Sequence, residues 1–94
     1  MKKIALIGIG KMGISHLAIA NQTPGISVKA ICDTSKPLIR MFEKNTKFLG
    51  FTDYKKMINE VPLDGVMILV PNAYHFEIVK YCVNKGIHVF IEKP

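Results

Sequence analysis

Residues 4–13 of the chain read Ile-Ala-Leu-Ile-Gly-Ile-Gly-Lys-Met-Gly, an apolar run that passes directly into a glycine-rich turn. A continuous apolar run such as Ile4–Ile7 is typical of a central strand in a parallel sheet that is covered on both faces. Apolar residues then follow at helical spacing from Lys11 to about Gln22, and Pro24-Gly25 ends that pattern. The stretch therefore predicts a strand, a tight turn and a helix in immediate succession.

The same alternation continues to the end of the chain. Further strands are predicted over Val28–Cys32, Phe48–Phe51 (weak and near an edge), Val66–Val70 and Ile87–Ile91. Helices are predicted between them, with Ser35, Asp53 and Asn72 as N-caps and with Asn45 (left-handed) and Gly86 as C-terminal stops. In the last of these helices, we expect four buried apolar residues: Ile78, Val79, Cys82 and Val83. Because short strand–helix connections favour parallel pairing, we predict one α/β domain over residues 1–94, a three-layer sandwich with a mostly parallel five-stranded sheet.

Composition narrows the class of protein. Of the 94 residues, 49% are apolar and 21% are charged, which excludes collagen-like, low-complexity and disordered chains. Cys32 and Cys82 have no C-x-x-C spacing, so neither a disulfide framework nor a metal site is predicted. The apolar runs are too short to span a bilayer. We therefore expect a soluble, cytoplasmic protein without a membrane partner.

The chain is basic, with 13 Lys and Arg against 7 Asp and Glu, a net charge of +6. Such a charge suits nucleic acid or an anionic ligand. The basic residues are spread singly or in pairs, however, and no aromatic residues alternate with them. The sequence therefore predicts no nucleic acid partner and favours a small ligand that carries phosphates.

Gly8, Gly10 and Gly13 form a G-x-G-x-x-G pattern between the first predicted strand and helix, the context that gives this otherwise weak motif meaning. Gly8 would permit the tight turn, Gly10 would let the backbone approach a pyrophosphate, and Gly13 would let the helix pack closely. The backbone amides of Gly8, Gly10, Lys11, Met12 and Gly13 are thus candidates to bind a dinucleotide at the positive end of the helix. The alternative is a plain glycine-rich turn.

Asp33 follows the second predicted strand, twenty residues beyond Gly13. A carboxylate at this place accepts hydrogen bonds from the adenosine ribose and repels a 2′-phosphate, which predicts NAD rather than NADP. Lys36 and Arg40 nearby would soften this preference. The alternative is that Asp33 only caps the turn into the next helix.

Several stretches together are similar to one family: Gly8–Gly13 with His16, Ile31–Asp33, Thr52–Tyr54, Asp64–Val66, Val70–Asn72 with His75, and Glu92–Pro94. On these residues the chain resembles the N-terminal, Rossmann-type part of the Gfo/Idh/MocA oxidoreductases, relatives of glucose–fructose oxidoreductase and inositol 2-dehydrogenase. The resemblance covers essentially the whole chain.

The resemblance implies roles for residues outside the glycine motif. Val70, Pro71 and Asn72 would line the nicotinamide side of the cofactor cleft. His75 would lie near the dinucleotide, although a packed imidazole is the alternative. Glu92 and Lys93 would lie at the cofactor, with Lys93 as the catalytic residue that touches the substrate hydroxyl and the nicotinamide.

The function implied is hydride transfer between nicotinamide and a hydroxyl of a sugar, sugar nucleotide or cyclitol. Family members continue into a second α/β domain that binds substrate and supports homo-oligomers, so we expect the 94 residues to be an N-terminal fragment that is inactive alone. The alternative function is a stand-alone NAD-binding sensor without catalysis. A purely structural α/β domain would leave Asp33 and the glycines without a role.

Overall fold

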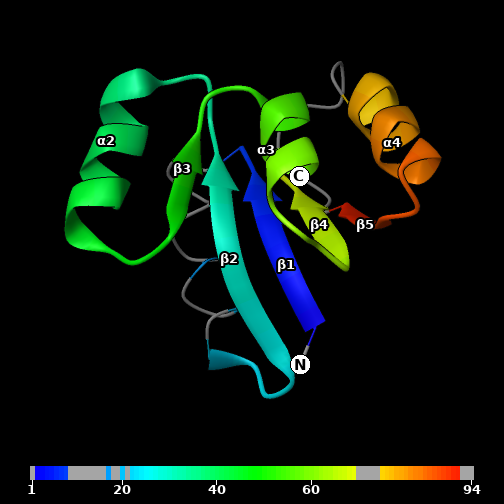
Figure 1. Cartoon of the computed structure of the whole chain (residues 1–94), viewed down its shortest axis with the longest axis horizontal. Helices are drawn as coiled ribbons and strands as arrows, with labels where there is room; N and C mark the ends of the chain where they lie inside the picture. The colour runs from blue at the N-terminus through cyan, green and yellow to red at the C-terminus, as the bar shows by residue number, and fades with distance from the viewer. Residues whose placement is uncertain (1, 9–16, 18–19, 21, 70–74, 92–94) are drawn as a thin grey trace.

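In the computed structural model, residues 2–8, 17, 20, 22–69 and 75–91 are described, and five strands of this part form one sheet in the order β3-β2-β1-β4-β5 (Figure 1). The strands are β1 (Lys2–Ile7), β2 (Ile26–Cys32), β3 (Leu49–Phe51), β4 (Gly65–Ile68) and β5 (His88–Ile91). All four pairings between them are parallel. The predicted five-stranded sheet is confirmed, with the weak strand β3 at one edge.

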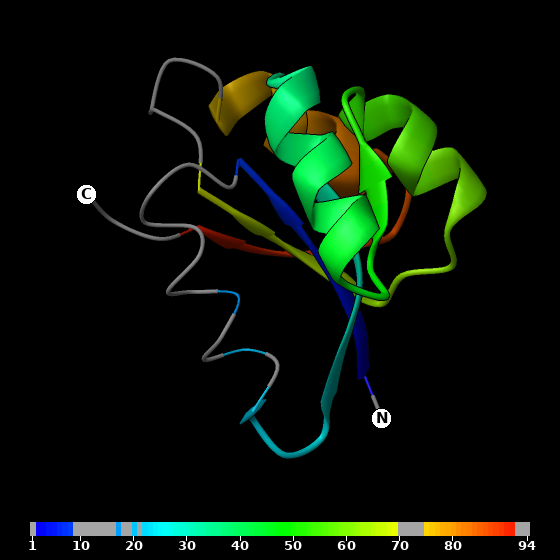
Figure 2. The same cartoon turned by 90° about the vertical axis from the view of Figure 1, so that its left-hand side faces the viewer.

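Helices cover both faces of this sheet. They are α2 (Lys36–Asn45), α3 (Tyr54–Glu60) and α4 (His75–Asn84), and residues 17, 20 and 22 are also helical. In Figure 2, α3 lies on one side of the strands and the light-blue segment that precedes β2 lies on the other. The three-layer α/β architecture is therefore confirmed.

Two apolar cores, one on each face, hold the layers together. On one face, Met57 of α3 and Cys82 of α4 pack with Ala5 and Val66 of the sheet. On the other face, the core combines residues of β1, β2, α2 and the helical residues before β2; its members are Ile4, Leu6, Leu17, Ala20, Val28, Ile31, Ile39 and Phe42. The central strand β1 supplies both cores, and this explains why its last four residues are all apolar and at most 6% exposed.

The start of α2 is as predicted, but its end is not. Ser35 is the N-cap, and its hydroxyl accepts a hydrogen bond from the Leu38 amide at 3.4 Å. The prediction that Asn45 ends the helix in a left-handed conformation is wrong, because Asn45 is the last helical residue and Thr46 is the C-cap with extended backbone. The Thr46 amide and hydroxyl donate to the Phe42 carbonyl at 2.9 and 2.6 Å. These two hydrogen bonds give the Phe42 carbonyl its partners, so the helix ends without a residue at positive φ.

In helix α4, one of the four residues predicted to be buried is exposed. Ile78 and Cys82 are buried as predicted, and Val79 packs partly buried against the same core, but Val83 is 60% exposed. Val83 is rotated by about 100° from Cys82 around the helix axis and so leaves the buried stripe. Gly86, with φ +74°, follows the helix as the predicted C-terminal glycine. The predicted N-cap Asn72 lies outside the described residues.

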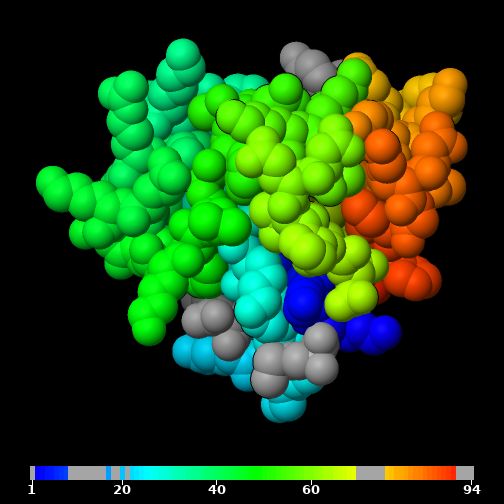
Figure 3. Space-filling model, in the orientation of Figure 1, coloured from blue at the N-terminus to red at the C-terminus, as the bar shows by residue number. Residues whose placement is uncertain are grey.

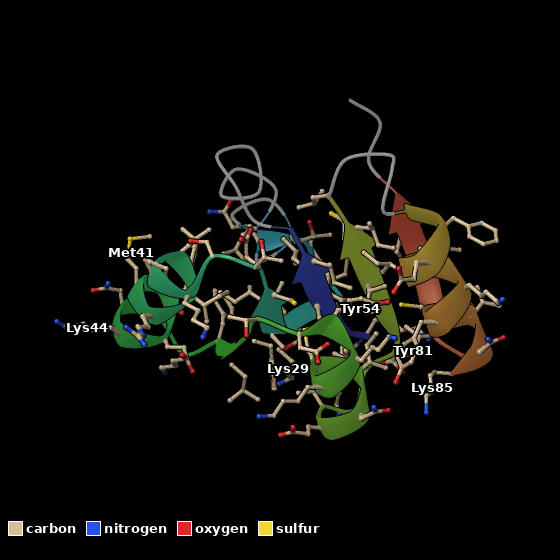
Figure 4. All side chains as sticks on the ribbon, turned by 90° about the horizontal axis from the view of Figure 1, so that it is seen from above. Lys29, Met41, Lys44, Tyr54, Tyr81 and Lys85 are labelled. Carbon is tan, nitrogen blue, oxygen red and sulfur yellow. The ribbon has the colours of Figure 1, made fainter. Side chains whose placement is uncertain are left out.

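Tyr54 and Tyr81 connect α3 with α4 (Figure 4). Their rings meet edge to face, with centroids 5.7 Å apart. The Tyr54 hydroxyl donates to Glu77 at 3.1 Å, and the Asn59 amide donates to the Tyr81 hydroxyl at 2.9 Å. These contacts fix the orientation of α4, which begins next to the carboxyl edge of the sheet.

In the described part of the chain, no helix has the length and apolar character that a membrane span requires.

Candidate functional site

The carboxyl ends of the strands meet at one edge of the sheet, the carboxyl edge. The Gly8 amide, just after β1, donates to the Cys32 carbonyl of β2 at 2.8 Å. The Leu69 amide, just after β4, donates to the Ile7 carbonyl at 2.8 Å. Ligands of open α/β sheets bind at this edge, beside the point where the strand order reverses. Here the order reverses at β1, which lies between β2 and β4.

Gly8 has the backbone conformation that the predicted tight turn needs. Its φ is +87°, in the left-handed region where a side chain is strained. This φ is compatible with the tight turn predicted at Gly8. The other members of the motif (Gly10, Lys11, Met12 and Gly13) lie outside the described residues.

Asp33 follows β2 directly and lies next to Gly8 across the sheet edge. Its Oδ1 accepts a hydrogen bond from the Ser35 amide at 2.9 Å, and its own amide donates to the Phe51 carbonyl of β3 at 3.0 Å. The turn-capping role considered for Asp33 is therefore present. This role positions the half-buried carboxylate at the edge rather than excluding it from ligand binding.

The thiol of Cys32, the residue before Asp33, is buried and stays protonated. Burial, followed by the charges of Asp33 and Asp53, raises the pKa of Cys32 to about 12. A thiol of this kind is neither a nucleophile nor a metal ligand at neutral pH. Both Cys32 and Cys82 are free and buried. Among the described residues, no group of three His, Cys, Asp or Glu side chains is arranged to hold a metal ion.

Lys36 and Arg40 are exposed on the first turns of α2, immediately after Asp33. Four residues apart, they share one face of the helix. Positive charge is thus available close to Asp33 along the chain, as the sequence indicated.

Most of the residues predicted to form the nicotinamide side lie outside the described part of the chain. Val70, Pro71, Asn72, Glu92 and Lys93 lie outside the described residues, and of His75 only the helical backbone at the start of α4 is described. The strands before these segments, β4 and β5, are neighbours, and Ile68 pairs with Ile91. The sheet therefore brings the two segments' starting points together.

Phe51 also contributes to this edge, and no sequence motif predicted its role. Its carbonyl anchors the Asp33 amide, and its register partner in β2 is Cys32. The one feature of the sequence that could have indicated this role is the position of Phe51 at the end of a strand predicted to lie near the sheet edge.

The described part of this edge fits a dinucleotide. A glycine that can take positive φ ends one strand, and a fixed carboxylate ends the neighbouring strand, as required for a pyrophosphate next to a ribose.

Comparison with known proteins agrees with this geometry. The model of the Gfo/Idh/MocA family, described as "Oxidoreductase family, NAD-binding Rossmann fold", matches residues 2–94. An inositol 2-dehydrogenase of Salmonella typhimurium is 30% identical over 95 residues, which cover 98% of this chain and 28% of that protein. An alpha-N-acetylgalactosaminidase of Shewanella oneidensis is 28% identical over 102 residues, covering 98% of this chain and 22% of that protein.

Among solved structures, scyllo-inositol dehydrogenase from Lactobacillus casei with bound NAD(H) and scyllo-inositol superimposes with a TM-score of 0.89 at 27% identity. The match covers 100% of this chain and 28% of that one. The chain thus spans between a fifth and a third of the length of these relatives.

Proposed function

Since the chain belongs to the Gfo/Idh/MocA family of oxidoreductases and carries its NAD-binding Rossmann domain, we propose that the carboxyl edge of its sheet binds NAD for hydride transfer. The substrate would be a hydroxyl of a cyclitol, sugar or sugar nucleotide. The inositol dehydrogenases among the relatives support the cyclitol class most directly.

One observation carries the cofactor part of this proposal. Gly8 and Asp33 follow two adjacent strands that are joined at their ends by the 2.8 Å hydrogen bond between the Gly8 amide and the Cys32 carbonyl. The proposed pyrophosphate turn therefore begins beside a carboxylate that can accept from ribose hydroxyls.

The roles proposed for the individual residues rest on their resemblance to the family, and the positions of Gly8 and Asp33 support them. The pyrophosphate is held by backbone amides of Gly8, Gly10, Lys11, Met12 and Gly13. Asp33 accepts from the adenosine ribose and disfavours NADP. The nicotinamide side is formed by Val70, Pro71, Asn72, His75, Glu92 and Lys93.

Lys93 is the proposed catalytic residue. NAD, when bound, supplies the hydride acceptor. The amine of Lys93 holds the substrate hydroxyl and takes part in moving its proton.

A second candidate function is cleavage of a glycosidic bond, which the similarity to the Shewanella alpha-N-acetylgalactosaminidase favours. A sensor without catalysis is a weaker candidate, because the named relatives described above are enzymes. The free, buried cysteines fit a reducing compartment, and we propose a cytoplasmic location. We also propose that the protein forms a homo-oligomer and that it does not bind nucleic acid.

Calorimetric titration of the chain with NAD and NADP tests the proposal. We expect tighter binding of NAD, and no binding of either cofactor by Gly10→Val, because a branched side chain fills the space that the pyrophosphate needs. Far-ultraviolet circular dichroism checks that this variant is folded. Equal affinity for NAD in Gly10→Val and the parent chain would show that the glycine loop is not the phosphate site.

A further inference from the structure

A basic hollow lies beside the start of β1, the middle of β2, the start of β3 and the end of α3. Its volume is about 340 Å³, and it is lined by Lys3, Lys29, Lys47, Leu49, Val61 and Pro62. Figure 3 shows β2, in cyan, exposed on this face between the green segment leading into β3 and the yellow-green end of α3. Three of the lining residues are lysines and none is acidic. The basic hollow thus combines positive charge with an apolar wall.

Lys29, which lines the basic hollow, lies at a β-bulge. Ile4 pairs with Val28, whereas the next residue, Ala5, pairs with Ala30, so Lys29 is the extra residue in β2. As a consequence, Val28 and Ala30 belong to the cores on opposite faces of the sheet, although residues two apart share a face in a regular strand. Bulges re-aim a side chain and often lie next to functional sites. Figure 4 shows Lys29 beside α3.

The lysine charges of the basic hollow are only partly balanced. Asp64 accepts a hydrogen bond from the Lys3 amide at 2.7 Å, and its carboxylate interacts with the charges of Lys2 and Lys3. Within the described residues, Lys29 and Lys47 have no carboxylate partner at ion-pair distance. Two of the three lysines that line this space therefore have no internal carboxylate partner.

A structural role for these lysines must be separated from a binding role. Helix α3 has no basic residue in its own last turn, and Val61 at its end lines the basic hollow. Cations near a helix C-terminus stabilise its exposed carbonyls. If the lysines act only on the end of α3, removing one of them should change the stability of the fold and nothing else. This role does not require the apolar wall or the volume of the basic hollow.

We propose that the basic hollow binds a small organic phosphate. The phosphate lies among Lys3, Lys29 and Lys47, and the apolar part of the molecule contacts Leu49, Val61 and Pro62. The volume of about 340 Å³ is at the lower end of the range of about 300–1,000 Å³ for small-molecule sites. The site is separate from the proposed NAD site, because Gly8 and Asp33 follow the carboxyl ends of β1 and β2, whereas Lys3 lies near the amino end of β1 and Lys29 in the middle of β2.

The test is an amide NMR titration of the isotope-labelled chain with phenyl phosphate in the presence of excess NAD. We expect saturable shifts at Lys29, Lys47, Leu49 and Val61, and no such shifts with phenol, which lacks the phosphate. Lys29→Met keeps the apolar stem but removes the charge, and it should raise the Kd for phenyl phosphate about threefold to fivefold. Lys80→Met, at an exposed lysine of α4, is the matched control and should leave the Kd unchanged.

Two results would overturn the proposal. One is equal weakening of binding by Lys29→Met and Lys80→Met, which would reflect net charge alone. The other is a lower urea midpoint for Lys29→Met with no change in phenyl phosphate binding, which would leave only the helix-end role. If NAD itself fails to bind, the shifts at Lys29 and Val61 still report on the basic hollow separately.

Discussion

Asp33 performs two tasks with one side chain at the carboxyl edge. Its Oδ1 accepts from the Ser35 amide and so shapes the turn between β2 and α2. The proposed second task is recognition of the adenosine ribose. A carboxylate that is already held by a backbone amide loses little conformational freedom when a ligand binds, so the structural task supports the binding task.

Asp33→Asn separates these two tasks. The amide oxygen of Asn still accepts from the Ser35 amide, so we expect a melting temperature close to that of the parent chain. Loss of the charge should lower the ratio of NAD to NADP affinity about tenfold, measured by calorimetry. Asp53→Asn is a matched control, since Asp53 also follows a strand and caps a helix through its Oδ1. An unchanged affinity ratio in Asp33→Asn would remove the ribose assignment.

Gly50 in β3 is a residue whose lack of a side chain is required by packing. A Cβ at this position would lie 2.6 Å from Cγ2 of Ile39 and 2.7 Å from Cγ of Glu43. Ile39 is buried in α2 and only 4% exposed, so it cannot move away freely. The close approach of α2 to β3 therefore depends on this glycine.

Gly50→Ala should lower the free energy of unfolding by about 1–2 kcal/mol, because overpacking outweighs the lower backbone entropy of Ala. Urea denaturation followed by circular dichroism measures this change. Ile39→Leu lacks Cγ2, so the double variant should be more stable than the sum of the single effects predicts. Strict additivity of the two changes would contradict the proposed clash.

At the scale of elements, Asp64 joins three strands at the amino end of the sheet. Its carboxylate accepts from the Lys3 amide at 2.7 Å, and its own amide donates to the Lys3 carbonyl at 2.7 Å. Its carbonyl accepts from the His88 amide of β5 at 3.1 Å. The loop before β4 is thereby bound to both β1 and β5.

The Asp64 carboxylate should make stability depend on acid pH. The hydrogen bond from the Lys3 amide, with the charges of Lys2 and Lys3, holds the pKa of Asp64 below its ordinary value of 3.8. A carboxyl with a lowered folded-state pKa stabilises the fold above the unfolded-state value, and this contribution is lost as pH falls through the folded-state value.

We therefore expect Asp64→Asn to unfold at a lower urea concentration than the parent at neutral pH. This difference should shrink as the pH falls below 3.8. Urea midpoints measured across this range for both chains check the prediction. A constant difference at all pH values would mean that the charge of Asp64 contributes nothing.

At the scale of the whole molecule, the sheet separates two proposed sites. The carboxyl edge carries Gly8 and Asp33, and the basic hollow around Lys29 lies beside the start of β1 and the middle of β2. The chain matches only 28% of the length of the Lactobacillus casei dehydrogenase. Positioning of an alcohol against a nicotinamide contributes about 7–11 kcal/mol to such reactions, and it requires a wall on both sides of the substrate.

The 94-residue chain should therefore bind NAD without oxidising inositols or sugars, as NADH absorbance would show. A hybrid in which the chain replaces the matching segment of the Lactobacillus casei enzyme should form NADH from scyllo-inositol, and Lys93→Met in the hybrid should abolish this. Steady turnover by the isolated chain would contradict the prediction. Release of nitrophenol from a nitrophenyl N-acetylgalactosaminide would instead support the glycosidase candidate.

Local patterns in the sequence were sufficient for the elements and for part of the site. The apolar run at Ile4–Ile7 predicted a strand covered on both faces, and Ser35, Asp53 and Gly86 marked helix ends correctly. These features depend on interactions between residues a few positions apart, so a single sequence contains the information. The positive φ of Gly8 after a strand belongs to the same class.

Tertiary structure decided the contacts between segments that are distant in the chain. The bulge at Lys29 depends on how β2 pairs with β1, whose register shifts by one residue at this point. The Phe51 carbonyl reaches the Asp33 amide because β3 pairs with β2. The exposure of Val83 likewise depends on how α4 is rotated against the sheet. Register and helix rotation minimise the free energy of the whole packed core, and therefore no local pattern of residues determines them.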